Sequence, residues 1–467
     1  MSTQSQQLFL TPLADWIRRT DDHVAHRLAL LEEAERVLAE PEAVSPEDRA
    51  RLSERLERWR YQHLNKRRGR LGPEDRQLAE ALDWAANRLA GRASRAPRAA
   101  RAAISDSGAD DSALAAAAAC LDPAVPLEEV TRRAREITDR HFGRLAPDKP
   151  DTTGQGRDAA APRRRMALYA PLYLSSFCTN YCAYCGFRFP HSIRRKHLTH
   201  EQAVREAAAL NGRGFRHILL VAGDFPSLTT VEYYAGILRT LSARGVQPTV
   251  EVAPQSTRAY AALARAGARG VTLYQETYLE DLYQRYHARG SKAAFDWRLE
   301  GLERAAEAGM ARLGLGVLLG LADPRQDVVR LMRHGRYLAS RFPDRTIAFS
   351  LPRIREAPDG FQPPYPVDDE TLVRLYCGLR VAFPRAELVL STREPAALRN
   401  RLAALCITQM SAGSCTTPGG YEDAATAEEL GRQFPVCDRR SPAEVAAWLR
   451  GAGFEVAWDL APQTAVG

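Results

Sequence analysis

The sequence predicts an α/β protein, a TIM-type (β/α)8 barrel with a helical N-terminal extension. Three observations lead to this fold class. From residue 166 onward, short apolar runs alternate with amphipathic segments, which is typical of a parallel sheet with crossover helices. Eight such runs can be found, the number that closes a barrel. Unusual polar residues follow most of the runs, at the strand ends where barrel enzymes place their chemistry.

The candidate strands are taken directly from the apolar runs. In chain order they are ALYAPLYL (167–174), RHILLVAG (216–223), PTVEVAP (248–254), GVTLYQE (270–276), LGLGVLLG (313–320), TIAFSLP (346–352), ELVLST (387–392) and CITQMSA (406–412). Helical segments lie between them, and SPAEVAAWLRGAG (441–453) supplies the eighth helix.

The chain before the barrel divides into two parts. Residues 1–100 are expected to be a helical extension of unknown role, and residues 101–165 a pre-barrel segment with helices at 111–120 and 126–142. The small, polar and basic stretch 92–112 is typical of a linker. Residues 166–467 form the barrel and its C-terminal region.

Composition limits the cellular setting. The N-terminus lacks the basic and apolar blocks of a signal peptide, and no run of about eighteen apolar residues occurs, so we expect a cytoplasmic protein without a membrane partner. The net charge is +8 at pH 7, with eight Lys or Arg against two Glu in Arg51–Arg70. A solvated helix face explains this stretch better than a nucleic-acid patch, so nucleic acid is not an expected partner.

Three of the eight cysteines lie in one short loop, Cys178, Cys182 and Cys185, with the spacing C-x3-C-x2-C. In a reducing compartment such a cluster indicates a metal or redox site. Three thiolates can hold three irons of a 4Fe–4S cluster and leave the fourth iron open to a ligand. Zinc also accepts three cysteines, and buried structural thiols are the remaining alternative.

This loop, directly after the first strand, resembles the signature of the radical SAM superfamily. The resemblance implies one 4Fe–4S cluster held by Cys178, Cys182 and Cys185, whose open iron binds S-adenosylmethionine (SAM). Reductive cleavage of SAM then yields a 5′-deoxyadenosyl radical. Tyr184 matches the aromatic residue that the superfamily packs against the adenine. A radical SAM barrel is therefore the expected fold.

Further motifs resemble, in order and spacing, the radical SAM aromatic amino acid lyases, and most of all the 2-iminoacetate synthases of thiazole biosynthesis. They are APLYLSSFCTNYCAYCGF, VTLYQETY, GLGVLLGLAD, FSLPRIR, LVLSTRE and QMSAGSCTTPGGY, and the resemblance covers roughly residues 100–460. It implies a lyase that cleaves the Cα–Cβ bond of L-tyrosine to 2-iminoacetate (dehydroglycine) and p-cresol, for thiamine biosynthesis. No C-x2-C follows the first cysteine loop, so we expect no second cluster of the hydrogenase-maturase kind.

The same resemblance suggests substrate residues. Arg393 in STRE matches an arginine that holds the substrate carboxylate, and a guanidinium can grip a carboxylate with two parallel hydrogen bonds. Ser411 and Tyr173 occupy positions of further contacts near the amino group. His287, after the fourth strand, is a candidate acid or base for the phenol, although a solvated loop histidine is the commoner reading.

SAM contacts are also suggested by position. Asp224 in AGD stands where the family usually has a glutamate for the methionine amino group, which is a departure from the pattern. Gln275, Glu276 and Arg353 lie at strand ends where SAM contacts occur. For Glu276 and Arg353 a structural ion pair is an equal alternative.

Two other functions stay open on the sequence alone. One is a radical SAM lyase for tryptophan or another aromatic amino acid, and the other is an inactive cluster-binding scaffold protein. The enzyme readings require a low-potential electron donor such as flavodoxin or ferredoxin, and thiazole synthase is a partner that the resemblance suggests. The extension is a candidate docking module for a partner protein.

Overall fold

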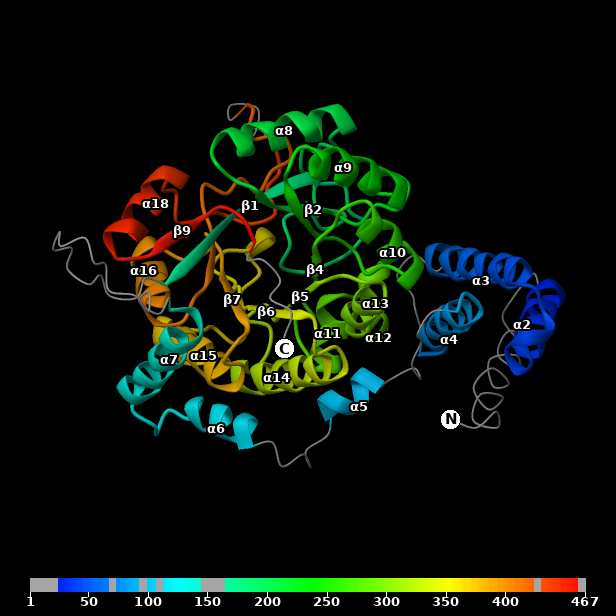
Figure 1. Cartoon of the computed structure of the whole chain (residues 1–467), viewed down its shortest axis with the longest axis horizontal. Helices are drawn as coiled ribbons and strands as arrows, with labels where there is room; N and C mark the ends of the chain where they lie inside the picture. The colour runs from blue at the N-terminus through cyan, green and yellow to red at the C-terminus, as the bar shows by residue number, and fades with distance from the viewer. Residues whose placement is uncertain are drawn as a thin grey trace, which may run out of the picture.

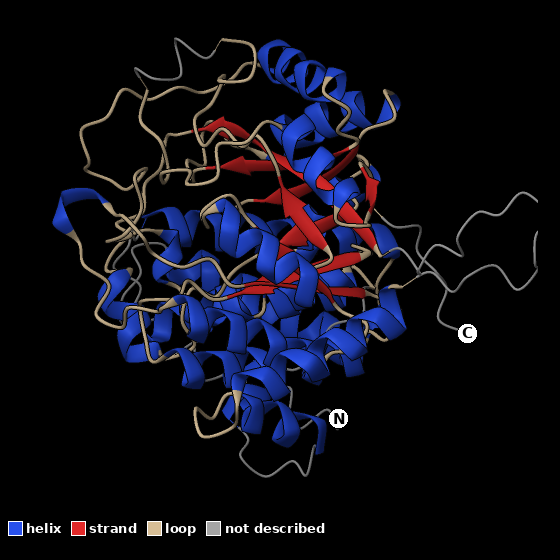
Figure 2. Cartoon of the chain, turned by 90° about the vertical axis from the view of Figure 1, so that its left-hand side faces the viewer, coloured by secondary structure: helices blue, strands red, loops and turns tan. Residues whose placement is uncertain are grey.

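A computed structural model describes residues 24–66, 73–91, 99–105, 112–143, 164–423 and 430–460. Its centre is a barrel of eight parallel strands surrounded by helices, as predicted (Figures 1 and 2). The strands are β1 (Arg165–Ser175), β2 (His217–Ala222), β3 (Gln247–Glu251), β4 (Gly270–Thr272), β5 (Arg312–Gly316), β6 (Thr346–Ser350), β7 (Glu387–Leu390) and β8 (Gln409–Ser411).

Strand β1 closes the barrel because it pairs with both β8 and β2. Residues 167–169 pair with β8, and residues 170–175 pair with β2 with a register irregularity near its end. A ninth strand, β9 (Glu455–Ala457), pairs in parallel with the first residues of β1. The sequence did not predict β9, a three-residue strand that is only half-buried.

Helices cover the outside of the barrel. They are α8 (His200–Gly212), α9 (Val231–Ala243), α10 (Thr257–Arg265), α11 (Glu280–Tyr286), α12 (Phe295–Leu299), α13 (Gly301–Glu307), α14 (Pro324–Arg341), α15 (Asp369–Ala382), α16 (Ala396–Leu405) and α18 (Pro442–Gly451). Helix α18, expected from SPAEVAAWLRGAG, begins with a capping box in which Ser441 and Glu444 exchange side-chain and backbone hydrogen bonds. No helix of the described residues is long and apolar enough to cross a membrane.

A polar layer fills the lower part of the barrel interior. Arg312 donates to the Gln409 side chain (2.8 Å), Gln409 donates to His217 Nδ1 (2.7 Å), and His217 Nε2 lies 2.9 Å from Thr249 Oγ1. Burial and the charge of Arg312 hold the pKa of His217 well below its ordinary value, so this ring is neutral. These side chains satisfy one another's hydrogen-bonding groups inside the barrel. The candidate site lies at the other end of the barrel, where the strands end.

The pre-barrel helices α5 (Ala99–Ser105), α6 (Ser112–Cys120) and α7 (Leu127–Phe142) pack against α14 and α15. The helices expected at 111–120 and 126–142 are confirmed. The linker expected at 92–112 was wrong for its middle, because Ala100 and Ile104 of α5 are buried in the main core. The remainder of that stretch, 92–98 and 106–111, lies outside the described residues.

In the described part of the extension the chain forms the helices α2 (Val24–Ala39), α3 (Pro46–Lys66) and α4 (Pro73–Leu89), as expected from the sequence. These helices share a hydrophobic core of their own, which includes Leu31, Leu56, Trp59, Leu82 and Ala85. Figure 1 shows α3 and α4 beside α10 and α12 on one flank of the barrel, with α2 on their outer side. The prediction for residues 1–23 lies outside the described residues.

Polar and aromatic contacts attach the extension to the barrel. Asn87 donates to Thr257 at 2.9 Å, and Arg258 forms an ion pair of 2.7 Å with Glu54. The guanidinium carbon of Arg60, in α3 of the extension, lies 4.1 Å from the centroid of the buried Trp297 ring of α12. Arg304 of α13, a barrel residue, lies 3.4 Å from the same centroid. Desolvated cation–π contacts of this kind contribute about 2 kcal/mol each.

Replacing Trp297 with Ala should loosen the extension. We expect Trp297→Ala to lower the free energy of unfolding by about 3–5 kcal/mol, because it removes a buried indole and both cation–π contacts. Limited proteolysis should then cleave within α2–α4 faster than in the wild type, whereas Trp448→Ala on the half-buried face of α18 should not change this rate. Equal cleavage of wild type and Trp297→Ala would contradict the docking role.

Candidate active site

The cysteine loop is held by its backbone to loops that follow other strands. Cys178 and Cys185 are half-buried and Cys182 is buried, and all three are free thiols. The anchoring hydrogen bonds, from the loop amide to the accepting carbonyl, are Thr179 to Asp224 (2.9 Å), Tyr181 to Arg289 (3.1 Å), Ala183 to Tyr286 (3.2 Å) and Gly186 to Gln433 (3.0 Å). Segments after β2, β4 and β8 thus fix the loop over the barrel end.

Burial raises the pKa of all three thiols, that of Cys178 to about 11. Asp224 adds to the rise at Cys178, and Lys292 opposes it at Cys182. A thiol in such surroundings is protonated unless a positive ion binds it, because a coordinating cation deprotonates its thiol ligands.

The three cysteines line one cavity at the carboxyl ends of the strands, which opens to solvent and has about 690 Å³ of empty space with its mouth included. Asp224 and Glu276, both predicted site residues, line it as well. The other polar and aromatic lining residues are Asn180, Phe187, Glu251, Tyr274, Ser291, Lys292, Arg298 and Gln433.

Glu276 stands in a buried charge cluster. Its carboxylate lies 2.5 Å from the Lys292 ammonium and 3.4 Å from the Arg298 guanidinium. Burial alone would raise the pKa of Glu276, but the two cations outweigh it, so the pKa lies below the ordinary value of 4.5. Its φ of 70° is in the left-handed region, which costs a non-glycine residue about 1–3 kcal/mol and is typical of functional sites.

Asp224 is bonded within the protein at the cavity wall. Its carboxylate accepts a hydrogen bond from Asn180 Nδ2 (3.1 Å) and another from the Ser291 hydroxyl. Asn180 Oδ1 in turn accepts the Lys292 amide at 2.9 Å. This network joins the cysteine loop to the segment that supplies Lys292.

Tyr184 and His287 form a pair outside the cavity lining. The Tyr184 hydroxyl lies 2.8 Å from His287 Nε2, and His287 Nδ1 lies 2.8 Å from the Tyr283 carbonyl. A carbonyl only accepts, so Nδ1 carries the proton and Nε2 accepts from Tyr184. His287 is fully buried, which shows that its reading as a solvated loop histidine was wrong. In this arrangement His287 orients Tyr184.

Two predicted SAM residues point to other partners. Gln275 reaches the Phe295 carbonyl at 3.5 Å and is not among the cavity-lining residues. Arg353 donates to Glu394 with Nε (2.9 Å) and Nη2 (2.6 Å) and to the Val367 carbonyl (2.8 Å), and it also pairs with Asp369. These contacts agree with the alternative that Arg353 forms a structural ion pair and does not contact SAM.

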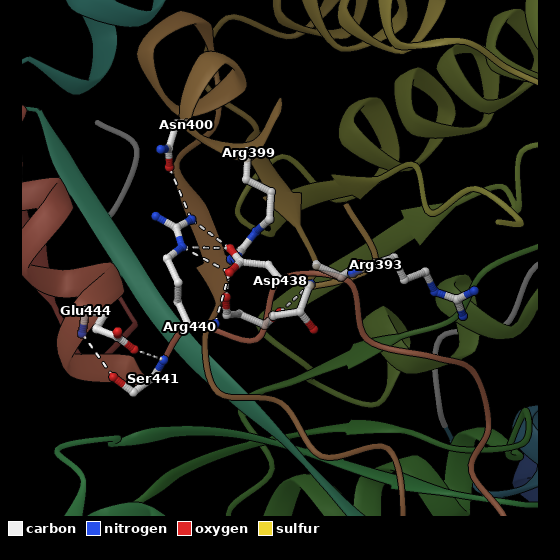
Figure 3. A network of polar contacts seen from close by, with 10 residues as sticks. Arg393, Arg399, Asn400, Asp438, Arg440, Ser441 and Glu444 are labelled. Carbon is white, nitrogen blue, oxygen red and sulfur yellow. Dashed lines mark hydrogen bonds and ion pairs between the residues drawn. The ribbon is translucent and has the colours of Figure 1, made fainter. Parts of the chain in front are cut away.

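Arg393 is half-buried and, among the described residues, makes no side-chain hydrogen bond or ion pair. Its guanidinium carbon lies 3.4 Å from the centroid of the Phe434 ring. Figure 3 shows the side chain extending away from the neighbouring network in which Arg399 and Arg440 both pair with Asp438. That network fixes the segment after Cys437 beside β7, and within the described part of the chain it does not include an ion pair with Arg393.

Tyr173 and Ser411 occupy the barrel wall. Tyr173 donates its hydroxyl to the side chain of Gln433, a cavity-lining residue, and its ring meets Phe187 edge-on. Ser411 is buried, accepts the Thr392 amide at 3.0 Å, and is not a lining residue. Tyr173 therefore lies next to the site, whereas Ser411 joins β8 to the loop after β7.

Sequence reasoning missed several residues that line the cavity, Asn180, Glu251, Lys292, Arg298 and Gln433. Glu251 gave a usable signal, since it is a carboxylate at the end of an apolar strand. Lys292 and Arg298 gave none, because they come from the segment around α12, where a basic residue is ordinarily solvated.

Two family descriptions match the chain. The Radical SAM superfamily matches residues 172–334, and the Biotin and Thiamin Synthesis associated domain matches residues 350–455. The 2-iminoacetate synthase of Escherichia coli (strain K12) is 36% identical over 343 residues, which cover 73% of this chain and 85% of that protein. The 3-methylornithine synthase of Methanosarcina barkeri is 23% identical over 56% of this chain and 66% of its own length.

A solved structure also resembles the chain over nearly its whole length. The FeFe-hydrogenase maturase HydG from Carboxydothermus hydrogenoformans is 26% identical, with a TM-score of 0.63 over 99% of this chain and 86% of its own. The structural likeness therefore extends beyond the barrel into the residues before it.

The charge cluster predicts a double-variant result. Lys292→Met should destabilise the protein by about 3–5 kcal/mol at neutral pH, because it leaves a buried carboxylate with one cation fewer. The double variant Lys292→Met/Glu276→Gln should recover most of this loss in urea unfolding.

The pH dependence has a defined sign. Because the pKa of folded Glu276 lies below 4.5, its contribution to stability is present at neutral pH and is lost as the pH falls below 4.5. The difference between wild type and Lys292→Met should therefore shrink in acid. If the double variant Lys292→Met/Glu276→Gln did not recover the lost stability, the pairing of Lys292 with Glu276 would be contradicted.

Proposed function

The chain belongs to the radical SAM superfamily, and on that premise we propose that it is a carbon–carbon lyase that converts L-tyrosine to 2-iminoacetate and p-cresol. The main support is the 36% identity to a 2-iminoacetate synthase over 85% of that protein's length. The unpaired Arg393 cation and a cavity with carboxylates and cations on its wall agree with a zwitterionic amino-acid substrate.

Family membership implies a 4Fe–4S cluster and SAM, and the residues present fit both. Cys178, Cys182 and Cys185 are free, line one cavity, and offer the three thiolates that such a cluster needs. No three His, Cys, Asp or Glu side chains in the described part of the chain are grouped as ligands of a single metal ion. Ligands of a cluster each bind a different iron, so they need not meet at one point.

When bound, the cluster and SAM supply a 5′-deoxyadenosyl radical. The chain's own residues bind and orient the substrate. We assign Arg393 to the tyrosine carboxylate, because its guanidinium forms no ion pair with any described residue and its flat face lies against Phe434. Tyr173 donates its hydroxyl to Gln433, a cavity-lining residue whose carbonyl accepts the Gly186 amide of the cysteine loop. A fixed orientation of this kind contributes several orders of magnitude to the rate.

Family membership implies a reductant as well as a substrate. We propose a low-potential flavodoxin or ferredoxin as the electron donor. The product 2-iminoacetate hydrolyses readily in water, so transfer to a thiazole synthase, as in thiamine biosynthesis, is the proposed fate. The similarity to 2-iminoacetate synthase supports both assignments.

Anaerobic reconstitution with iron and sulfide, followed by SAM, dithionite and tyrosine, tests the function. We expect p-cresol and 5′-deoxyadenosine together, measured by chromatography. Deoxyadenosine with tryptophan cleavage and no p-cresol would move the substrate to tryptophan. Neither product from protein with a verified cluster would favour the scaffold alternative.

The cluster ligands have a separate test. Wild type should bind ~4 iron atoms per chain with the absorbance and reduced-state EPR of a 4Fe–4S cluster. Each of Cys178→Ser, Cys182→Ser and Cys185→Ser should lose most of this iron and all deoxyadenosine formation. Cys415→Ser and Cys437→Ser should retain both, and iron loss in these two variants instead would refute the assignment.

A further inference from the structure

Glu251 is the second unpaired charge in the site. It ends β3, where it pairs in register with Val221 of β2, and it lines the cavity with the three cysteines. Within the described residues its carboxylate makes no hydrogen bond or ion pair, unlike Glu276 and Asp224. A half-buried carboxylate without a partner is unfavourable in the empty site, which indicates a cationic ligand.

The groups that act on Glu251 come from several elements of the barrel rim. Glu276 after β4 is a like charge, whereas Arg393 after β7, Arg298 of α12 and Lys292 before α12 are cations. Lys292 and Arg298 are already paired with Glu276. Three tyrosines also interact with the Glu251 charge, namely Tyr169, Tyr173 and Tyr274. Burial is the main cause of their raised pKa values, and the negative charge of Glu251 raises them further. Arg393 and Glu251 are thus two opposite charges that act on each other and are not paired.

We propose that Glu251 is the subsite for the amino group of the amino-acid substrate, where it binds the ammonium and then accepts its proton, while Arg393 holds the carboxylate. The inference rests on the proposed function for the identity of the substrate. It assigns the two free charges of the site to the two charges of an amino-acid zwitterion.

The chemistry requires such a base. A free amino acid enters as an ammonium, and removal of a hydrogen atom from nitrogen requires the neutral amine. The ammonium therefore transfers a proton to the Glu251 carboxylate, giving R–NH2 and a neutral carboxylic acid, with no oxidant or reductant involved. The pKa of Glu251 suits this transfer, since burial, with a further contribution from Glu276, raises it to about 7.

Glu251→Gln tests the role, with Glu201→Gln on the exposed first turn of α8 as the matched control. At pH 7 we expect Glu251→Gln to lower kcat for p-cresol by ~100-fold or more, the usual range for loss of a general base. The wild-type rate should rise with pH through about 7, since Glu251 must be ionised. The variant should not show this rise with pH. It should recover activity only at alkaline pH, where the ammonium group of tyrosine loses its proton to solvent without a protein base. Wild-type rate and pH profile in the variant would overturn the proposal.

Binding without turnover gives an independent readout. The probe is 3-(4-hydroxyphenyl)propionate, which keeps the carboxylate and phenol of tyrosine but lacks the amino group. With oxidised cluster and SAM, wild type should bind tyrosine at least ~10-fold more tightly than the probe, the loss expected for one buried charge-assisted hydrogen bond. Glu251→Gln should remove this preference by weakening only tyrosine. The proposal would be overturned if Glu251→Gln still preferred tyrosine over the probe as strongly as wild type does. It would also be overturned if the variant lost affinity for SAM and not for tyrosine.

The wild-type protein separates this inference from the proposed function. If wild type forms deoxyadenosine but cleaves another aromatic amino acid, the tyrosine assignment fails. The Glu251→Gln comparison, repeated with that amino acid and its desamino analogue, still decides the role of Glu251.

Discussion

Closure of the sheet by β1 is the constraint on which the rest of the structure depends. Because β1 pairs with β8 through its first half and with β2 through its second, all eight strands point their carboxyl ends to one rim. The cysteine loop continues directly from β1, so its position follows from the most extensively paired strand. Backbone hydrogen bonds to Asp224, Arg289 and Gln433 then fix the loop against segments that are remote in sequence.

Several charged side chains lie at the rim, and not all of them are paired with an opposite charge of the protein in the described residues. Glu276, Lys292 and Arg298 satisfy one another, whereas Glu251 and Arg393 do not. Glu251 lines the cavity and Arg393 acts on it electrostatically from the loop after β7. Partly desolvated charges of this kind lower stability, and they interact more strongly with a ligand than charges in water do. A zwitterionic substrate compensates both at once. The neighbouring Asp438 differs from these two charges, because its carboxylate pairs with both Arg399 and Arg440.

The sequence alone predicted the barrel, its helices and the cysteine loop, because apolar periodicity and cysteine spacing are local signals. It could not distinguish Gln275 from Glu276, since the left-handed turn at Glu276 sets which side chain faces the cavity. Nor could it decide whether Arg353 is a SAM contact or part of a structural ion pair, because the carboxylates that engage Arg353 are brought together only by folding. For His287 the commoner expectation from sequence was a solvated loop histidine. Its burial and its hydrogen bond with the Tyr184 hydroxyl arise only from tertiary packing.

The extension is part of the site's surroundings, which its sequence did not reveal. A second cavity, with about 1500 Å³ of empty space, lies between α3 and the barrel rim. Its wall includes Arg58 and Arg60 from α3, and it shares Asp224, Pro254 and Ser291 with the first cavity. Arg60 stacks on Trp297, and the next residue along α12, Arg298, contacts Glu276. Two consecutive residues of α12 thus connect α3 of the extension with the buried charge cluster at the rim of the cavity.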